Sequence, residues 1–268
     1  MSSFTSSQPD FMRQTPVMSN LIIINVVMLV ATYTASRVFH FDLIELLGLH
    51  YPESEYFRPW QLVSYMFMHS GLSHLFFNMF ALWMFGRTLE HAFGSKRFLF
   101  YYLFTGLGAM SLHLFVLFLQ IYPMQRAANE VMLNFSPEAF AAFMDKYFPN
   151  MLNVPASTVT DASTGGTIMY QCIHRVMDIP TVGASGAVYG ILLAFGVLFP
   201  NVRIFLLIPP IPIKAKWFVI IFGLIEVYLG FMQPGSGVAH FAHVGGMLFG
   251  YLLLRYWKRN GSIRQYYV

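Results

Sequence analysis

Charged residues are scarce in this chain. Of its 268 residues only 10% are Asp, Glu, Lys or Arg, while 56% are hydrophobic and 28 are phenylalanine. A soluble domain usually carries about 25% charged residues. A chain with so little charge could not cover its whole surface with groups that face water, so the sequence indicates an integral membrane protein.

Cysteine is rare, and no cleavable leader is expected. The single cysteine, Cys172, excludes an internal disulfide. Residues 1–19 are polar and contain one basic residue, Arg13, without the charged start, short apolar core and small-residue cleavage site of a signal peptide. We expect these residues to form an N-terminal tail. The net charge of +4 is small and does not indicate a nucleic-acid partner.

Long apolar runs, in contrast, are abundant. Six of them have the length of about 20 residues that a helix needs to cross the hydrocarbon core of a bilayer. They cover approximately residues 20–38, 61–84, 98–120, 184–200, 213–232 and 238–257. We therefore predict an all-α membrane protein whose membrane domain, residues 20–257, is a bundle of six transmembrane helices.

Two connections between these spans are long. Residues 39–60 form a polar loop, and residues 121–183 predict an extramembrane insert between the third and fourth spans. Within the insert, Ser136-Pro137-Glu138 is a favourable helix start. Apolar residues follow it at helical spacing, at Phe140, Phe143, Met144 and Phe148. We expect an amphipathic helix on the outer leaflet or on the bundle, with a substrate-gating lid as the alternative.

The end of the insert has a different composition. The stretch from Ser157 to Thr167 is rich in Ser, Thr and Gly, which predicts a loop.

The basic residues orient the bundle. With a cytoplasmic N-terminus, 11 of the 16 Lys and Arg residues fall on the cytoplasmic side. The positive-inside rule therefore places both termini, including a tail of residues 258–268, in the cytoplasm. A bacterial inner membrane is the simplest location. In this orientation Ser185 and His243 both lie towards the outer side, at similar depth.

Ser185 lies in Gly183-Ala184-Ser185-Gly186, at the start of the fourth span. The N-terminus of a helix offers unpaired N–H groups and positive potential, which suit an oxyanion. A serine here could also simply cap the helix. The G-x-S-x-G pattern of α/β-hydrolases is excluded because position 187 is alanine.

His243 stands among small residues in the sixth span. A neutral imidazole can accept the proton of a serine hydroxyl. Glycines at small-xxx-small spacing let membrane helices approach closely, so a hydrogen bond between Ser185 and His243 is geometrically possible. The packing glycines in these two segments are Gly183, Gly186, Gly190, Gly246 and Gly250.

An acidic residue to orient this imidazole is not expected. Glu226 in the fifth span is predicted to lie too near mid-membrane to meet Ser185. We expect its carboxylate to make a structural hydrogen bond to a neighbouring helix instead. The pattern therefore favours a Ser–His dyad over a triad. Tyr189, one turn after Ser185, could pack against the His243 ring in place of a carboxylate.

Further polar residues could complete the site. His74 and Asn78 share a face of the second span at i, i+4 spacing and could donate to an oxyanion; alternatively they form a buried network with the first loop. His69 is expected to cap a helix. His240 could hydrogen-bond into the site or face an outer aqueous cavity.

Metal binding is not expected. His69, His74, His240 and His243 could converge on the outer side, but the sequence has no H-E-x-x-H and no carboxylate at ligand spacing.

In these motifs the chain resembles the rhomboid intramembrane serine proteases. The resemblance extends from about residue 20 to 257, apart from the insert. Each motif is short on its own, but the motifs occur together in an order that is specific to the family. The motifs are Arg58-Pro59-Trp60-Gln61, His74-Leu75-Phe76-Phe77-Asn78, Phe85-Gly86-Arg87 with Glu90 and Gly94, Gly183-Ala184-Ser185-Gly186, and Ala239-His240-Phe241-Ala242-His243-Val244-Gly245-Gly246.

The resemblance implies a six-helix bundle with an active site open to the outer face. Ser185 would be the nucleophile and His243 the general base. The Ser185 N–H, His74 and Asn78 would hold the oxyanion, and Tyr189 would support His243. Substrates would be membrane proteins cut in or near their spans, without metal or organic cofactor.

Two other functions are compatible with part of the sequence. A rhomboid-like protein without activity could bind membrane clients, although such proteins usually lose the serine or the histidine. A transporter would also contain intramembrane polar groups, but the chain has no detectable inverted repeats and no broken-helix pair.

Overall fold

The computed structural model describes residues 15–149, 151, 158–205, 211–233 and 238–262. It divides into two compact units. The first contains Met1–Gly48, Trp60–His113 and Thr181–Val268, and the second contains Leu49–Pro59 and Leu114–Pro180. The fold is that of an all-α membrane protein, with one two-stranded hairpin among the described residues.

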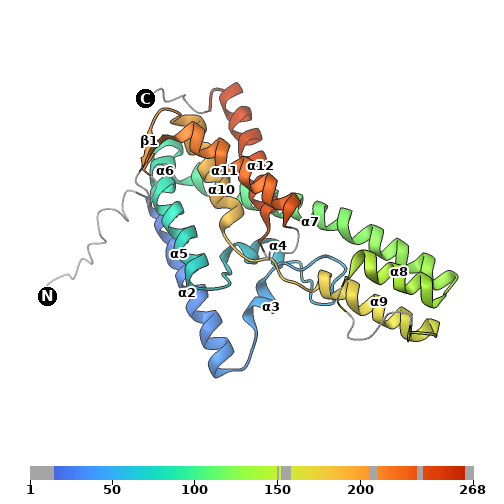
Figure 1. Cartoon of the computed structure of the whole chain (residues 1–268). Helices are drawn as coiled ribbons and strands as arrows, with labels where there is room; N and C mark the ends of the chain where they lie inside the picture. Colours follow the sequence, from blue (N-terminus) through green and yellow to red (C-terminus); the bar gives the residue numbers. More distant parts are fainter. Residues whose placement is uncertain (1–14, 150, 152–157, 206–210, 234–237, 263–268) are drawn as a thin grey trace. The chain divides into compact units, whose positions relative to one another are not determined.

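The first unit holds most of the helices (Figure 1). In chain order these are α2 (Pro16–Val38), α3 (Leu43–Leu47), α4 (Gln61–Ser64), α5 (Leu72–Ala81), α6 (Arg87–Phe93), the first part of α7 (Ser95–Leu133), α10 (Ser185–Leu198), α11 (Ala215–Met232) and α12 (His240–Arg259). A π-helical turn, Leu82–Gly86, joins α5 to α6. The antiparallel strands β1 (Arg203–Phe205) and β2 (Pro212–Lys214) precede α11. Helix α10 packs against α11 and α12.

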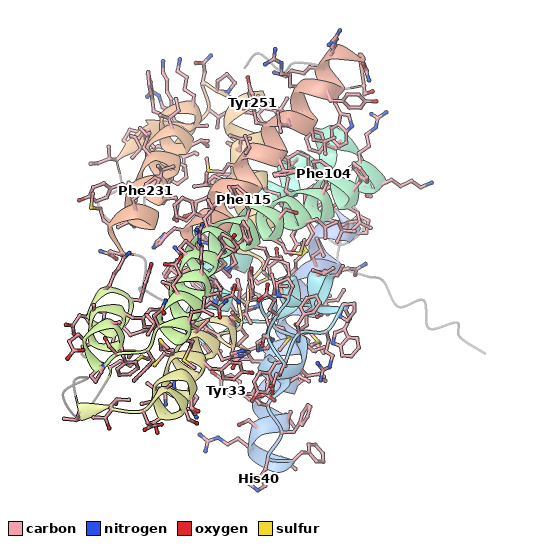
Figure 2. The ribbon with its side chains drawn as sticks, turned by 90° about the vertical axis from the view of Figure 1, so that its right-hand side faces the viewer. Tyr33, His40, Phe104, Phe115, Phe231 and Tyr251 are labelled. Carbon is pink, nitrogen blue, oxygen red and sulfur yellow. The ribbon has the colours of Figure 1, made fainter. Side chains whose placement is uncertain are left out.

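Three of the described helices are long and apolar enough to cross a membrane: α2, α7 and α11. Helix α10 is apolar but shorter. Large apolar side chains cover the outside of this unit, as Tyr33 (49% exposed), Phe231 (70%) and Tyr251 (45%) illustrate (Figure 2). Such a surface is unfavourable in water and suits lipid tails.

The predicted second span is interrupted near its start. Helix α4 ends at Ser64, a 3-10 turn covers Tyr65–Phe67, and the chain is extended at Met68 and Gly71 before α5 begins at Leu72. The expectation of one helix from residue 61 is therefore wrong. The interruption leaves the carbonyl of Tyr65 available to accept from the Gly183 N–H at 2.9 Å, so the break anchors the segment that leads into α10.

Helix α7 is longer than the third predicted span. It continues past residue 120 and through Pro123 to Leu133. At 1.5 Å per residue, its 39 residues extend about 58 Å, roughly twice the hydrocarbon thickness of a bilayer. The first part of the predicted insert is therefore a continuation of a helix that is long and apolar enough to cross a membrane.

The second unit has its own hydrophobic core. Helix α8 (Pro137–Tyr147) begins as predicted, with the Ser136 hydroxyl accepting from the Ala139 N–H at 3.1 Å. The expected amphipathic helix is present, and its apolar face packs inside this unit with residues of α7 and of α9 (Ala162–Met177). The buried members are Tyr51, Ile121, Ala128, Phe140, Phe143, Met144, Phe148, Val159, Met169, Cys172, Ile173 and Met177.

Helix α9 occupies part of the predicted loop. The expectation of a loop from Ser157 to Thr167 is wrong from residue 162 onward, and Ser157 itself lies outside the described residues. The Asp161 carboxylate caps the helix by accepting from the Thr164 N–H at 2.8 Å. A Cβ on Gly165 would lie 2.4 Å from the Phe135 ring, so this glycine permits close packing. Tertiary contact thus outweighs the low helix propensity of glycine here.

Candidate active site

Ser185 lies at the first turn of α10, two residues after a glycine whose backbone conformation side chains disfavour. Gly183 has φ +131°, a conformation that side chains disfavour, and a Cβ there would lie 2.9 Å from Cε1 and Nε2 of His74 and 3.5 Å from the Ser185 Oγ. Glycine at this position therefore satisfies two requirements. It allows the backbone turn into α10, and it leaves room for the edge of the His74 ring beside Ser185.

The hydroxyl of Ser185 meets the imidazole of His243. The Ser185 Oγ lies 2.8 Å from the His243 Nε2. Helices α10 and α12 can approach this closely because a Cβ on Gly246 would lie only 1.8 Å from the carbonyl oxygen of Gly186. Both residues are at the beginnings of their helices, which brings one reactive side chain from each to the same point.

The remaining packing glycines face α7. A Cβ on Gly190 would lie 2.6 Å from the Thr105 Cβ, and one on Gly250 would lie 2.4 Å from the Tyr101 hydroxyl. That hydroxyl donates to the Gly190 carbonyl at 2.8 Å. The small faces of α10 and α12 therefore meet each other near the site and also pack against α7, since a Cβ on Gly186 would lie 2.4 Å from the Cβ of Ala109.

Tyr189 stacks on the imidazole of His243. The two ring centroids are 4.3 Å apart and the rings are 5° from parallel. The Tyr189 hydroxyl donates to the Oε1 of Glu226. Tyr189 thus contacts both the imidazole and the acid beside it.

Glu226 hydrogen-bonds to residues of the neighbouring helices α10 and α12, as expected, and one of these residues is His243. Its Oε2 lies 2.9 Å from the Nδ1 of His243 and 2.7 Å from the Nδ1 of His240. The expectation that no acid would orient the imidazole is wrong, and of the two positions considered for His240 the structure has the one inside the site.

The positions of the helix ends explain why Glu226 reaches His243. Glu226 precedes the end of α11 at Met232 by about six residues, and His243 follows the start of α12 at His240 by about three. At 1.5 Å per residue these offsets differ by only about 4.5 Å, which a glutamate side chain can bridge. Comparing the two offsets across the connection between α11 and α12 would have identified the pair.

His74 and Asn78 lie on one face of α5, as their spacing indicates. The Nδ1 of His74 is 3.0 Å from the Ser70 Oγ, which leaves its Nε2 edge towards Gly183. The Asn78 Nδ2 donates to the carbonyl of His74 at 3.0 Å, and the second N–H of this amide is a further donor. His74 thus borders Ser185, whereas Asn78 is tied to its own helix.

His69 does not cap a helix. Its ring is 1% exposed and lies edge-on to the His74 ring at a centroid distance of 5.0 Å. Neither ring nitrogen has a hydrogen-bond partner within the described part of the chain. The expected capping role is therefore wrong.

Sequence comparison identifies the family of the chain. Residues 22–266 match a family model described as "Eukaryotic integral membrane protein (DUF1751)". A protein of Schizosaccharomyces pombe, named as an uncharacterized mitochondrial rhomboid protein, is 30% identical over 217 residues, which are 76% of this chain and 53% of that protein. This chain belongs to the rhomboid-like family of integral membrane proteins.

Two other relatives of this rhomboid-like protein match over shorter regions. RHOMBOID-like protein 6, mitochondrial, of Arabidopsis thaliana is 43% identical over 63 residues, 24% of this chain and 20% of its own. Rhomboid protease GluP of Bacillus subtilis is 44% identical over 48 residues, 18% of this chain and 10% of its own. The chain spans 53% or less of the length of these curated relatives.

The names of the family and of its relatives bear on which membrane holds the protein. The eukaryotic description of the family and the mitochondrial names of the fission-yeast and Arabidopsis relatives conflict with the expectation of a bacterial inner membrane. Integral membrane residence itself agrees with these names and with the apolar helices of this rhomboid-like protein.

Three residues of the site could by type hold a metal ion. Ligand atoms of Glu226, His240 and His243 lie within 4.8 Å of one another, so the expectation that no carboxylate would accompany the histidines is wrong. The same atoms are already paired by hydrogen bonds, with both Nδ1 atoms on one carboxylate oxygen. The donor set is thus satisfied without an ion, and the absence of a metal stays a prediction.

Proposed function

We propose that this rhomboid-like protein is an intramembrane serine endopeptidase that hydrolyses peptide bonds in or near the transmembrane segments of membrane proteins. The observation that carries the proposal is the 2.8 Å contact between the Ser185 Oγ and the His243 Nε2. A serine hydroxyl becomes a useful nucleophile when an adjacent base accepts its proton. The name of the Bacillus relative, a rhomboid protease, agrees with this chemistry.

The reaction follows the general course of serine hydrolases. As the Ser185 Oγ attacks the peptide carbonyl, its proton passes to the His243 Nε2, and a tetrahedral oxyanion forms. The imidazolium then gives this proton to the leaving amine as the C–N bond breaks. Water, activated by the same imidazole, hydrolyses the acyl-enzyme and regenerates the serine hydroxyl.

The oxyanion would be held by donors around the start of α10. The backbone N–H of Ser185 belongs to the first turn, where N–H groups have no intrahelical partner. The His74 edge beside Gly183 and the second amide N–H of Asn78 are the proposed side-chain donors. Such preorganised donors are usually among the largest contributions to hydrolysis.

The membrane arrangement is part of the same proposal. Six spans, cytoplasmic termini and a site near the outer ends of α10 and α12 would let water reach Ser185. Substrates would enter from the lipid, and the helix α5 beside α10 offers exposed apolar residues, Leu72, Phe76 and Phe77, towards it. No metal or organic cofactor is needed for the proposed reaction.

Labelling with a fluorophosphonate probe tests the proposed function. The purified, detergent-solubilised chain should react at Ser185, and both Ser185→Ala and His243→Ala should lose the label. Ser111→Ala is a matched control, because this exposed serine donates only within its own helix, to the Leu107 carbonyl at 2.9 Å. A folded wild type that does not react would contradict the proposal and favour a client-binding rhomboid-like protein.

A further inference from the structure

Glu226 is an unusual residue for its helix. Helix α11 buries only four of its 18 residues, Ala215, Val219, Glu226 and Gly230, and Glu226 is the one acid among them. Its neighbours Ile225 and Tyr228 are 45% and 61% exposed, as expected for a helix that faces lipid. A carboxylate is costly to bury unless its oxygens are paired. The hydrogen-bond partners of the Glu226 carboxylate therefore indicate its role.

Within the described part of the chain, the hydrogen-bond partners of this carboxylate all belong to the candidate active site. Its Oε1 accepts from the Tyr189 hydroxyl, and its Oε2 faces the Nδ1 of His243 at 2.9 Å and the Nδ1 of His240 at 2.7 Å. An ionised carboxylate can only accept hydrogen bonds, so each Nδ1 that pairs with it must carry a proton. A neutral imidazole protonated at Nδ1 has a free lone pair at Nε2.

We propose that Glu226 is a positioning residue that makes the site a Ser185–His243–Glu226 triad. This inference rests on the proposed function. The carboxylate selects the imidazole tautomer whose Nε2 can accept the Ser185 proton, and it stabilises the imidazolium that forms during the attack. It does not itself touch the substrate.

Tyr189 cannot perform this role alone. Its ring stacks on His243 and restrains the plane of the imidazole. A stacked aromatic face treats the two ring nitrogens alike and does not select where the proton lies. The hydroxyl of Tyr189 instead holds the Glu226 carboxylate from the other oxygen, so the tyrosine supports the acid as well as the ring.

His240 completes the surroundings of the carboxylate. It donates to the same carboxylate oxygen as His243. Two N–H donors on one oxygen and a hydroxyl on the other compensate the burial of Glu226. His240 thus stabilises the ionised form of Glu226 beside His243.

Steady-state kinetics of Glu226→Gln test this proposal. The amide preserves the size of the side chain but can donate to the His243 Nδ1, which places the ring proton on Nε2 and blocks proton acceptance. With a fluorogenic peptide that contains a transmembrane segment, kcat should fall by roughly 10²–10⁴. KM should stay within about threefold, since the substrate does not contact Glu226. A merely structural role would instead lower the melting temperature and leave kcat per folded molecule unchanged.

Two further variants keep the test decisive if Glu226→Gln does not fold. Glu226→Asp retains the charge with a shorter reach, so its kcat should lie between wild type and Gln, with KM again unchanged. Tyr189→Phe removes the donor on Oε1 but keeps both histidine bonds, and should lower kcat by less than about tenfold. A kcat of folded Glu226→Asp equal to that of the wild type would contradict the positioning role.

The outcomes separate this inference from the proposed function. If the wild type shows no Ser185-dependent turnover, the proposed function fails. If the wild type is active and folded Glu226→Gln keeps its kcat within about threefold, only the triad fails. Purified wild type that carries one equivalent of a divalent metal, and loses activity to a chelator, would also overturn it, because Glu226, His240 and His243 would then be metal ligands.

Discussion

Two buried glutamates in the first unit serve different purposes. Glu90 on α6 is 2% exposed and Glu226 on α11 is 7% exposed. The carboxylate of Glu90 accepts from the backbone N–H groups of Val17 at 3.0 Å and Met18 at 2.8 Å, and from the Ser95 hydroxyl at 2.6 Å. It caps the start of α2 and joins this helix to α6 and α7.

The partners of Glu226 are of another kind. They are a phenol and two imidazoles, one of which also meets a serine hydroxyl. Backbone N–H groups do not titrate, so the pairing of Glu90 fixes structure only. The partners of Glu226 can move protons. The comparison teaches that burial alone does not assign a role to an intramembrane acid, whereas the chemistry of its partners does.

The largest expected effect on catalysis is the loss of the Ser185 hydroxyl, which lies in the same site as Glu226. Ser185→Ala removes one oxygen and should abolish cleavage of a membrane-spanning peptide in proteoliposomes, because no nucleophile remains. The melting temperature in detergent should stay near that of the wild type. Cleavage that persists in this variant would remove Ser185 from the mechanism.

Loss of an oxyanion donor should have the next largest effect. Asn78→Ala should retain partial activity, with kcat lowered by at most about 10²–10³, or roughly 3–4 kcal/mol, because the Ser185 N–H and His74 remain. The same peptide assay measures it. An unchanged kcat would indicate that Asn78 only bonds to its own helix, as its contact with the His74 carbonyl would allow.

Displacing the His74 ring should lower kcat about as much as misplacing a catalytic group does. Gly183→Ala forces a Cβ into 2.9 Å contact with the His74 ring at a φ of +131°, and kcat should fall about 10²-fold. Gly71→Ala is the matched control: this glycine is extended, with φ 169°, and nothing lies within 4 Å of its Cβ position. Equal kcat values for the two variants would contradict the proposed fit.

The smallest effect on catalysis is expected at the other glutamate. Glu90→Gln has one oxygen where three donors need acceptors, and it should destabilise the fold by about 1–3 kcal/mol. Thermal unfolding in detergent measures this loss, while kcat per folded molecule should match the wild type. A large fall in the kcat of folded Glu90→Gln would contradict the assignment of a purely structural role to Glu90.

Local patterns predicted much of the architecture. The start of α8 follows from Ser136-Pro137-Glu138, and α11 and α12 begin within about two residues of the predicted spans. Motif order and glycine spacing directed attention to Ser185 and His243, which the structure places in contact. These features depend on short-range chemistry that a sequence displays directly.

What escaped prediction depends on contacts between distant segments. The break at Met68–Gly71 is stabilised by the Gly183 N–H on the Tyr65 carbonyl, and α9 forms in a Gly-rich stretch because Gly165 packs against Phe135. Glu226 meets His243 because the ends of α11 and α12 set their relative depth. The first two contacts have no local signature in the sequence, whereas the third could have been found from the similar distances of Glu226 and His243 from the connection between their helices.

The most direct test of the account is the position of the fluorophosphonate adduct, mapped by mass spectrometry after labelling the protein in liposomes. The wild type should carry an adduct on Ser185, and folded His243→Ala should carry none. An adduct on another serine, or equal labelling of Ser185 without His243, would contradict the activation of Ser185 by this imidazole.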